Sequence, residues 1–564
     1  MTSRIAPAVL FILMLIASLL QGGCGGATGS EAANSPVSLA VTGIRIWTGN
    51  PGQPWAEALA VRDDVLAVVG SRDDVLAQVD ENTVVWDGTG ALVVPGFIDT
   101  HVHFLWGGDG LASVQLRDAR TPEEFTRRIE RFADALEPGE WILNGTWDHE
   151  NWGGELPHRS WIDAVTSEHP VWVTRLDGHM GLANSAALAL AGVGADTEET
   201  VGGTIVRDAD GTPTGILKDN AMDLVARVVP EPTPDQRGRM LAAAMRHVAA
   251  QGVTSVHDMG DWASVDAYRR AHAEGGLTVR IYAFTPLSEW QRLADEVAGP
   301  GRGDEWLRIG GLKGFMDGSL GSHTAAFLEP FTDAPNDRGL LVNDPADVER
   351  WVREADARGL HVAVHAIGDR AIRSLLDIYQ RVAAANGPRD RRFRIEHAQH
   401  IHPEDLARFA ELDVIPSMQP YHAIDDGRWA DKVIGAERAR TTYAFAGLSG
   451  SGATLAFGSD WPVAPPTPLE GIYAAATRQT LDGEHPQGWV PEQKISVEQA
   501  LRAYTSGAAR AGFADDRRGS LTAGKLADFV ILDTDITGVN PAAIRDAKVL
   551  ATVVGGRIVH QAAP

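Results

Sequence analysis

The chain has 564 residues, of which 44% are hydrophobic, and its formal net charge is −25 at pH 7. This length is enough for one large core and at least one further domain. With 75 acidic against 50 basic side chains, the composition argues against the basic groove typical of nucleic-acid-binding proteins, so we expect no nucleic-acid partner.

The first residues have the pattern of an export signal. Arg4 precedes an apolar run over residues 6–20, which is followed by small residues and by Cys24, the sole cysteine. We therefore predict a lipoprotein-type signal peptide over residues 1–24 and a flexible linker over 25–36. The predicted location is the cell envelope or periplasm, and a lipid on Cys24 would be the only contact with a membrane. Secretion without a lipid anchor is the alternative.

Both ends of the remaining chain are rich in short strand patterns. Residues 37–86 carry strand-like pieces separated by turn signals, and residues 519–533 and 551–559 carry matching ones. We predict that residues 37–94 and 505–564 together form one small, discontinuous β-sandwich domain.

The middle of the chain, residues 95–504, alternates strand and helix patterns. Eight parallel strands in such alternation are the number in a barrel, so the predicted fold class is α/β, with a (β/α)8 TIM-like barrel. The predicted strands cover residues 95–103, 252–258, 278–284, 307–317, 360–368, 393–399, 413–419 and 454–460.

Residues 118–251 are too many for a loop between the first two barrel strands. This segment has strand patterns of its own and is rich in tryptophan. Because it follows a strand end, we interpret it as an inserted cap domain over the face of the barrel where active sites form. Its tryptophans either shape the substrate site or form the core of the insertion.

Two histidines end the first barrel strand. Side chains alternate along a strand, so His101 and His103 point to the same side, where two neutral imidazoles can hold one metal ion. Two unrelated histidines near a strand end are the alternative. The ends of four other predicted barrel strands carry Lys313, His365, His397 and Asp460, and a barrel brings all these ends to one pocket.

Lys313 lies in a mostly apolar, glycine-rich strand. Burial favours the neutral amine, which can react with carbon dioxide to give a carbamate that bridges two metal ions. The alternative is an ion pair with a nearby carboxylate such as Asp317.

These motifs resemble the amidohydrolase superfamily, and within it the amidohydrolase-3 group of YtcJ-like and N-substituted formamide deformylase-like proteins. The resemblance runs from about residue 38 to the end of the chain. It is carried by PGFIDTHVH (95–103), LDGHMGLANS (176–185), GVTSVHDMG (252–260), KGFMDGSLGSHTA (313–325), HAIGDRAI (365–372), RIEHAQ (394–399), FGSDWPV (457–463) and GSLTAGKLADFVILD (519–533).

The resemblance implies a cofactor and a ligand set. One or two divalent metal ions are expected, with zinc as the first choice and iron, manganese and cobalt also compatible with such ligands. His101, His103 and Asp460 would hold the first ion. His365 and His397 would hold the second, and Lys313, as a carbamate, would bridge the two.

The resemblance also implies roles in the reaction. Asp460 would take a proton from the attacking hydroxide and pass it to the leaving amine. His179 and His257 are candidates for binding the substrate. In a version with one metal, His397 would contact the substrate instead.

We therefore expect an exported metal-dependent hydrolase of a small-molecule substrate, acting on a non-peptide C–N bond in an amide or an N-substituted formamide. An esterase, lactonase or cyclic amidase with the same site is the first alternative. A non-catalytic envelope lipoprotein that binds a ligand is the second. Oligomeric state is not readable from the sequence.

Overall fold

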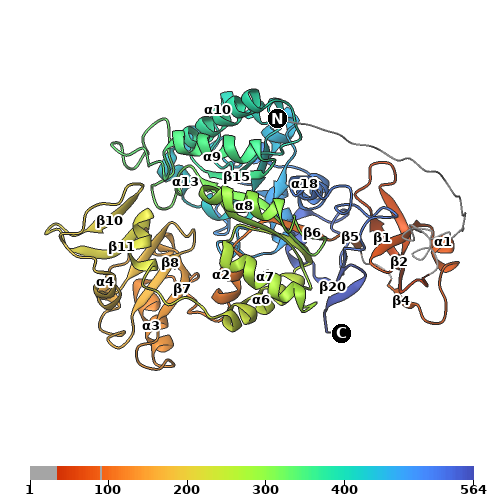
Figure 1. The fold of residues 1–564 in the computed structure, drawn as a ribbon, viewed down its shortest axis with the longest axis horizontal. Coiled ribbons are helices and arrows are strands. Elements are labelled where there is room, and N and C mark those ends of the chain that lie inside the picture. The colour runs from red at the N-terminus through yellow and green to blue at the C-terminus, as the bar shows by residue number, and fades with distance from the viewer. Residues whose placement is uncertain (1–34, 89–91, 564) are drawn as a thin grey trace, which may run out of the picture.

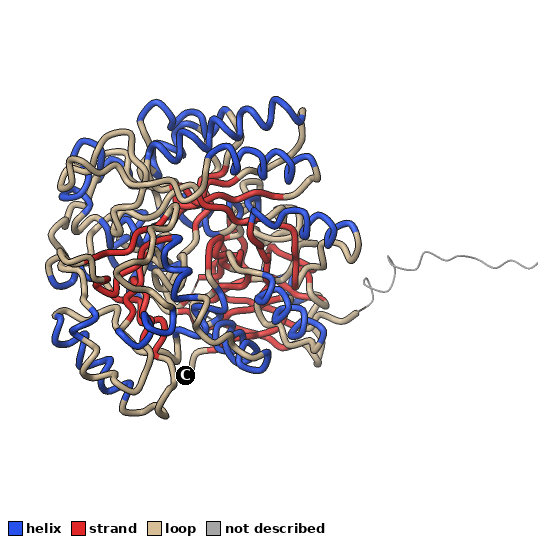
Figure 2. Tube along the Cα trace, turned by 60° about the vertical axis from the view of Figure 1, so that its left-hand side comes forward, coloured by secondary structure: helices blue, strands red, loops and turns tan. Residues whose placement is uncertain are grey.

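The computed structural model describes residues 35–88 and 92–563 (Figure 1). The predicted signal peptide, Cys24 and residues 25–34 of the predicted linker lie outside these residues. The described chain has three parts: a barrel, a cap, and a terminal β domain built from both ends. Strands gather in the middle of the molecule, and most helices lie outside them (Figure 2).

The barrel is a sheet of eight parallel strands in the described residues, and each strand lies where the sequence predicts one. β6, β12 and β15 are buried at every residue, as expected for strands covered on both faces. In spatial order the strands are β6 (Phe97–Val102), β12 (Val253–Asp258), β13 (Arg280–Pro286), β14 (Leu307–Phe315), β15 (His361–Ala366), β16 (Arg394–His397), β17 (Ile415–Met418) and β18 (Ala456–Phe457).

The last strand returns to the first and nearly closes the barrel. Val102 forms a parallel bridge with Trp461. The backbone N–H of Asp460 donates to the carbonyl oxygen of His101 at 2.7 Å, and that of His103 donates to the carbonyl oxygen of Trp461 at 2.8 Å. These bonds fix the ends of β6 and β18 side by side, which places their polar side chains at one point.

Helices cover the barrel on the outside. One of them, α6 (Pro234–Ala249), begins with a capping box between Thr233 and Gln236 and buries the apolar face that includes Leu241 and Val248. The others are α2 (Phe104–Gly110), α7 (Trp262–Ala273), α8 (Trp290–Ala298), α9 (Pro345–Ala357), α10 (Asp369–Asn386), α11 (Leu406–Glu411), α12 (Pro420–Asp426), α13 (Ala430–Ile434), α14 (Ala436–Ala439), α15 (Phe445–Ser451), α16 (Pro468–Thr477), α17 (Val497–Tyr504) and α18 (Ser506–Ala511).

The inserted segment forms a separate sheet with its own apolar cores. Trp147 and Trp172 are buried in these cores, and Trp152 and Trp161 pack against one of them, so the insertion's core accounts for these tryptophans. The cap contains α3 (Pro122–Ala133), α4 (Ser185–Ala191), α5 (Asp223–Ala226) and a sheet with the order β10 (Gly203–Arg207), β11 (Pro213–Asp219), β9 (Met180–Ala183), β8 (Val171–Arg175), β7 (Ile142–Trp147).

The two ends of the chain form one sheet. It has the order β21 (Arg557–Gln561), β20 (Val549–Val554), β19 (Phe529–Leu532), β5 (Leu92–Pro95), β1 (Leu39–Trp47), β2 (Trp55–Arg62), β3 (Val65–Gly70), with β4 (Val84–Asp87) also paired to β1 and α1 (Arg72–Leu76) beside it. A buried, two-pronged ion pair joins this domain to the barrel: Arg280 of β13 contacts both carboxylate oxygens of Asp528 at 2.8 and 2.9 Å.

Short 3₁₀ helices fill several connections, at His149–Trp152, Arg159–Trp161, Asn220–Met222, Leu287–Glu289, Pro403–Asp405, Pro491–Gln493 and Pro541–Asp546. Among the described residues, none of the helices combines the length and the apolar character needed to cross a membrane.

Candidate metal centre

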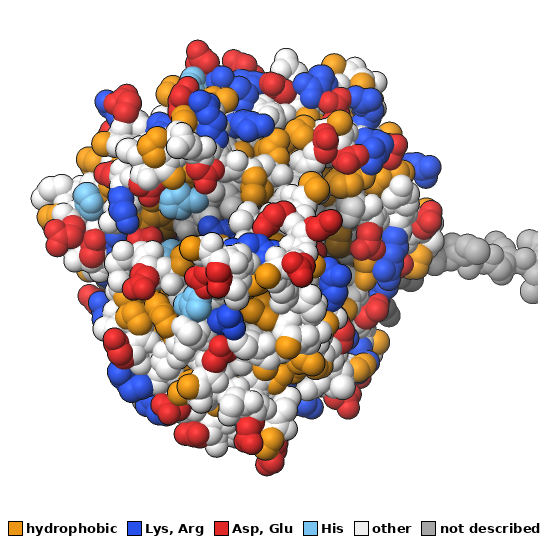
Figure 3. Space-filling model, turned by 90° about the vertical axis from the view of Figure 1, so that its left-hand side faces the viewer, with side chains coloured by type: hydrophobic (Ala, Val, Ile, Leu, Met, Phe, Trp, Pro, Cys, Tyr) orange, Lys and Arg blue, Asp and Glu red, His pale blue; other side chains and the backbone are white. Residues whose placement is uncertain are grey.

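A pocket of about 600 Å³ lies at the end of the barrel where the predicted residues meet. Five of the six predicted metal ligands line it, and the sixth, His101, lies directly beneath. The space-filling view shows a hollow in the face that carries the cap and the neighbouring barrel loops (Figure 3). The five lining ligands are His103, Lys313, His365, His397 and Asp460.

The first cluster consists of His101, His103 and Asp460. The Nε2 atoms of both histidines lie 3.3 Å from the same oxygen, Asp460 Oδ1. Burial opposes ionisation of Asp460, but the interactions with His101 and His103 outweigh it and lower the pKa of this carboxyl to about 2. The cluster therefore offers two imidazole nitrogens and one carboxylate oxygen to a single point.

A buried carboxylate orients His101 from behind. The Nδ1 of His101 lies 2.6 Å from Glu396 Oε2, and Arg394 donates to both oxygens of Glu396, at 2.7 and 2.9 Å. Since a carboxylate accepts, His101 Nδ1 carries the hydrogen and Nε2 keeps its lone pair for the pocket. Metal-binding histidines are commonly held in this way. Burial lowers the pKa of His101 well below its usual value, which keeps the ring neutral.

A second cluster includes a residue that sequence reasoning missed. His397, His422 and Asp460 each offer an atom within 4.8 Å of the others. His422 lies in α12, directly after β17, the seventh strand of the barrel. His422 has no local pattern such as His-x-His. Its position shortly after a predicted strand end was the only feature of the sequence that could have indicated it. Backbone strain also marks the site, since His397 and Asp460 adopt positive φ angles of 69° and 63°.

Lys313 lies on β14 and is buried, with 5% of its surface exposed. Burial lowers the pKa of its amine to about 8 although Glu396 and Asp460 oppose the shift. Its Nζ lies 3.2 Å from His101 Nε2. Asp317 instead accepts the backbone N–H groups of Ala326, Ile367 and Gly368, so the structure does not show the alternative ion pair with Lys313.

His365 lines the pocket, and a backbone carbonyl oxygen orients its ring. Its Nε2 lies 3.0 Å from the carbonyl oxygen of Gly318. A carbonyl only accepts, so Nε2 donates the hydrogen and Nδ1 keeps its lone pair. Its ring also contacts those of His179 and His397, with centroids 4.9 and 4.5 Å apart.

The two predicted substrate-binding histidines lie in different places. His179 lines the pocket, and Asp219 contacts its Nδ1 at 2.6 Å. Burial is the largest single influence and would lower the pKa of His179, but the hydrogen bond and charge of Asp219, together with the charges of Asp177 and Asp317, outweigh it and raise this pKa. The structure does not bring His257 to this pocket. His257 accepts a hydrogen bond from Arg394 and lines a smaller cavity with Tyr282.

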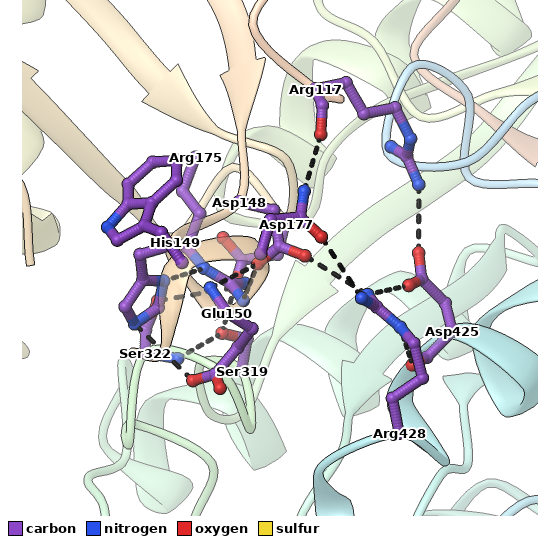
Figure 4. A network of polar contacts seen from close by, with 12 residues as sticks. Arg117, Asp148, His149, Glu150, Arg175, Asp177, Ser319, Ser322, Asp425 and Arg428 are labelled. Carbon is purple, nitrogen blue, oxygen red and sulfur yellow. Dashed lines mark hydrogen bonds and ion pairs between the residues drawn. The ribbon is translucent and has the colours of Figure 1, made fainter. Parts of the chain in front are cut away.

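Charged contacts tie the cap to the barrel beside the pocket (Figure 4). Arg175, at the end of β8, pairs with Asp148 at 3.2 Å and with Asp177 at 2.6 Å. Arg428, which follows α12, contacts the other oxygen of Asp148 at 3.2 Å and also pairs with Asp425. Because Asp148 is shared by a cap arginine and a barrel arginine, this network fixes the position of the cap over the pocket.

The chemistry and burial of these side chains fit a divalent metal ion. His397 Nδ1, His422 Nε2 and Asp460 Oδ1 are buried and have no hydrogen-bond partner. Native proteins rarely leave such atoms unpaired. Neutral imidazole and carboxylate are ligands that zinc and similar ions prefer.

Known proteins resemble this chain over most of its length. It is 44% identical over 532 residues to Protein LONG AFTER FAR-RED 3 of Arabidopsis thaliana, covering 92% of this chain and 91% of that one. It is 29% identical over 546 residues to an N-substituted formamide deformylase of Arthrobacter pascens, covering 92% and 97%.

A solved structure, that of an uncharacterized metal-dependent hydrolase from Pyrococcus horikoshii, matches with a TM-score of 0.72 at 28% identity, over 89% of this chain and 99% of that one. The family match itself spans residues 84–560. It includes the whole barrel, the cap and the clustered histidines, and it confirms the resemblance seen in the motifs. The chain therefore belongs to the amidohydrolase family.

Proposed function

We propose that this amidohydrolase cleaves a non-peptide C–N bond, in an amide or an N-substituted formamide, with zinc as its first-choice metal. The observation that carries the proposal is the buried cluster of His101, His103 and Asp460 at the floor of a pocket. The relative named as an N-substituted formamide deformylase, matched over 97% of its length, supports this choice of substrate.

The residues divide the chemistry among them. His101, His103 and Asp460 would hold a divalent metal, which when bound supplies an acidified water and polarises a carbonyl group. Asp460 is a carboxylate at neutral pH, so while Oδ1 faces the two histidines its other oxygen, Oδ2, can accept a proton from the attacking water and return it to the leaving nitrogen. His179, held in orientation by Asp219, would donate to the substrate's carbonyl oxygen.

Part of the pocket wall is apolar. Phe315, Leu320, Trp429 and Val463 contribute side chains to it. We assign this wall to the substituent on the substrate nitrogen, because burial of an apolar group there adds binding energy without competing for the polar cluster.

Lys313 is proposed to carry a carbamate. Its neutral amine would form an N–C bond with carbon dioxide and release one proton, which gives two ligand oxygens beside His101. For a second metal, the family resemblance implies His365 with His397, whereas His422 is the histidine that lies with His397 and Asp460.

The test is hydrolysis by the purified, metal-loaded chain of a panel of N-substituted formamides with aliphatic, aromatic and charged substituents. Release of formate and amine is measured together. Matched esters, lactones, cyclic amides and a dipeptide separate the alternatives. Preference for an ester or lactone would favour the first alternative, and tight binding with no turnover of any compound would favour a binding lipoprotein.

Export to the cell envelope with a lipid on Cys24 is also part of the proposal, and the basic, apolar and small-residue order of the first 24 residues supports it. Replacing Cys24→Ser should move the protein from the membrane fraction to the soluble fraction. An unchanged distribution would contradict lipid anchoring.

A further inference from the structure

A separate cavity of about 680 Å³ lies at the end of the barrel opposite the metal centre, beside the amino-terminal ends of β14 and β15. His361, the first residue of β15, lines this cavity, whereas His365 on the same strand lines the metal pocket. Roughly 13 Å of strand separates these two histidines. Arg302, Arg308 and Arg389 also contribute to the cavity wall. The cavity is therefore distinct from the metal centre and rich in arginine.

Two of these arginines have no carboxylate partner among the described residues. All the hydrogen bonds of Arg302 and Arg308 go to backbone carbonyl oxygens. Arg308 donates through Nη1 to Gly512 and Phe513 at 2.7 and 3.1 Å, which leaves its Nε and Nη2 groups for another acceptor. In a chain with 75 acidic side chains against 50 basic ones, arginines without a carboxylate are unexpected, and they indicate an anion that is not part of the protein.

The carboxylates near the cavity do not neutralise it. Arg389 lies 3.4 Å from Asp356, but Arg391 contacts the same carboxylate oxygen at 3.1 Å, so two cations share one carboxylate. Asp390 also lines the cavity, and it already pairs with Arg392 at 3.0 Å. The cavity therefore keeps an excess of positive charge.

The protein holds these arginines in place before any ligand binds. The guanidinium of Arg308 lies over the rings of Tyr282 and Phe513, 4.9 and 5.5 Å from their centroids. At Gly310 a Cβ atom would clash with Nη1 of Arg302, so the absence of a side chain there leaves room for that guanidinium. Donors that are already fixed lose little freedom on binding, which favours affinity for a ligand of matching shape.

We propose that Arg302, Arg308 and Arg389 bind a phosphate-bearing anion at this end of the barrel. Guanidinium groups bind phosphate through charge-assisted pairs of hydrogen bonds. A tetrahedral phosphate can accept from several guanidinium groups at once, whereas a carboxylate presents two oxygens in one plane. The phosphate could belong to a soluble compound or to a lipid headgroup. Because the cavity is separate from the metal pocket, this inference does not depend on the proposed function.

The test is a calorimetric titration of inorganic phosphate into the metal-loaded full chain. The wild type should show saturable binding that weakens as salt is raised toward ~0.15 M. Arg302→Gln and Arg308→Gln should each weaken binding about 10–100-fold, because each removes charge-assisted hydrogen bonds. The matched control is Arg292→Gln, which removes an arginine that also lies over a ring, 4.0 Å from the centroid of Trp262, but outside the cavity. Its affinity should equal that of the wild type. Phosphate bound at a metal ion would be unaffected by any of these substitutions.

Three results would overturn the proposal: no saturable binding by the wild type, full affinity in both cavity variants, or an equal loss in Arg292→Gln, which would indicate unspecific attraction to positive charge. Thermal unfolding checks that each variant folds. Arg308→Lys guards against a folding defect, because it keeps the charge but lacks the planar group. It should bind phosphate at least ~10-fold more weakly than the wild type, and unchanged affinity would contradict the role of the guanidinium.

Vesicles distinguish the two sources of the phosphate. The Cys24→Ser chain, which lacks the predicted site of lipid attachment, is floated with vesicles of phosphatidylglycerol or of phosphatidylcholine. Flotation that requires phosphatidylglycerol and that Arg308→Gln abolishes would assign the cavity to a headgroup. Phosphate binding without such flotation would assign it to a soluble compound, and binding of neither would overturn the proposal. None of these readouts uses turnover, so failure to cleave formamides would leave the inference intact.

Discussion

The substitution Glu396→Gln tests how a buried carboxylate orients His101 in the first cluster. Glu396 is fully buried, and its two oxygens accept from Arg394 at 2.7 and 2.9 Å and from His101 at 2.6 Å. Glutamine puts an NH₂ group where one of these oxygens was. In either orientation of the amide, its NH₂ group then faces an N–H donor of Arg394. The buried guanidinium of Arg394 also loses its countercharge.

The expected loss follows from these contacts. Removing one partner of a buried ion pair costs about 3–5 kcal/mol. With an unfolding entropy of roughly 2.1 cal/mol/K per residue, a chain of 564 residues that unfolds in one transition would lose about 3–4 °C in Tm. Since Glu396 also fixes the tautomer of His101, metal affinity should fall about 10–100-fold.

The assay is thermal unfolding of the metal-free protein together with a zinc titration. Glu404→Gln is the matched control, because Glu404 also pairs with an arginine, Arg373, at 3.1 Å, but its side chain is 76% exposed. The control should lose less than about 1 kcal/mol and no metal affinity. Equal effects of the two substitutions would refute the role assigned to the buried carboxylate.

Three further predictions concern other carboxylates. Asp460→Asn should lower kcat/KM at least ~100-fold, measured at matched metal content, because the proton carrier is lost; unchanged turnover would exclude that role. Burial raises the pKa of Asp426 to about 7. The folded state therefore keeps a proton on Asp426 that the unfolded state releases near pH 4. The free energy of unfolding should fall by about 4 kcal/mol as the pH rises from 4 to 7. In denaturant unfolding, Asp426→Asn should flatten this slope, and an unchanged slope would contradict the assignment. Asp528→Asn, which leaves Arg280 without its countercharge, should destabilise the fold by about 3–5 kcal/mol without altering metal content; normal stability would show that this pair does not join the two domains.

Much of the fold could be predicted because its signals are local. Each barrel strand is a short apolar run, and His101, His103, His365 and His397 stand at or beside strand ends, where the barrel topology alone brings them together. The prediction needed no knowledge of side-chain contacts. It therefore brought these residues to one pocket without ranking them.

The finer assignments depended on contacts between distant segments. Whether a strand-end histidine enters the pocket depends on where its side chain turns, and His257 turns to Arg394 instead. His422 gave no local motif, because a helix and not a strand carries it. Nor could the sequence show that Gly318 engages His365.

The barrel and the cap contribute different side chains to the pocket. Every residue of the two metal clusters belongs to the barrel or its loops, whereas the cap contributes Arg175, Asp177 and His179 to the same pocket. Arg175 is anchored by Asp148, which Arg428 of the barrel also holds. The cap can therefore change the side chains that meet a substrate while this shared anchor keeps its position over the clusters.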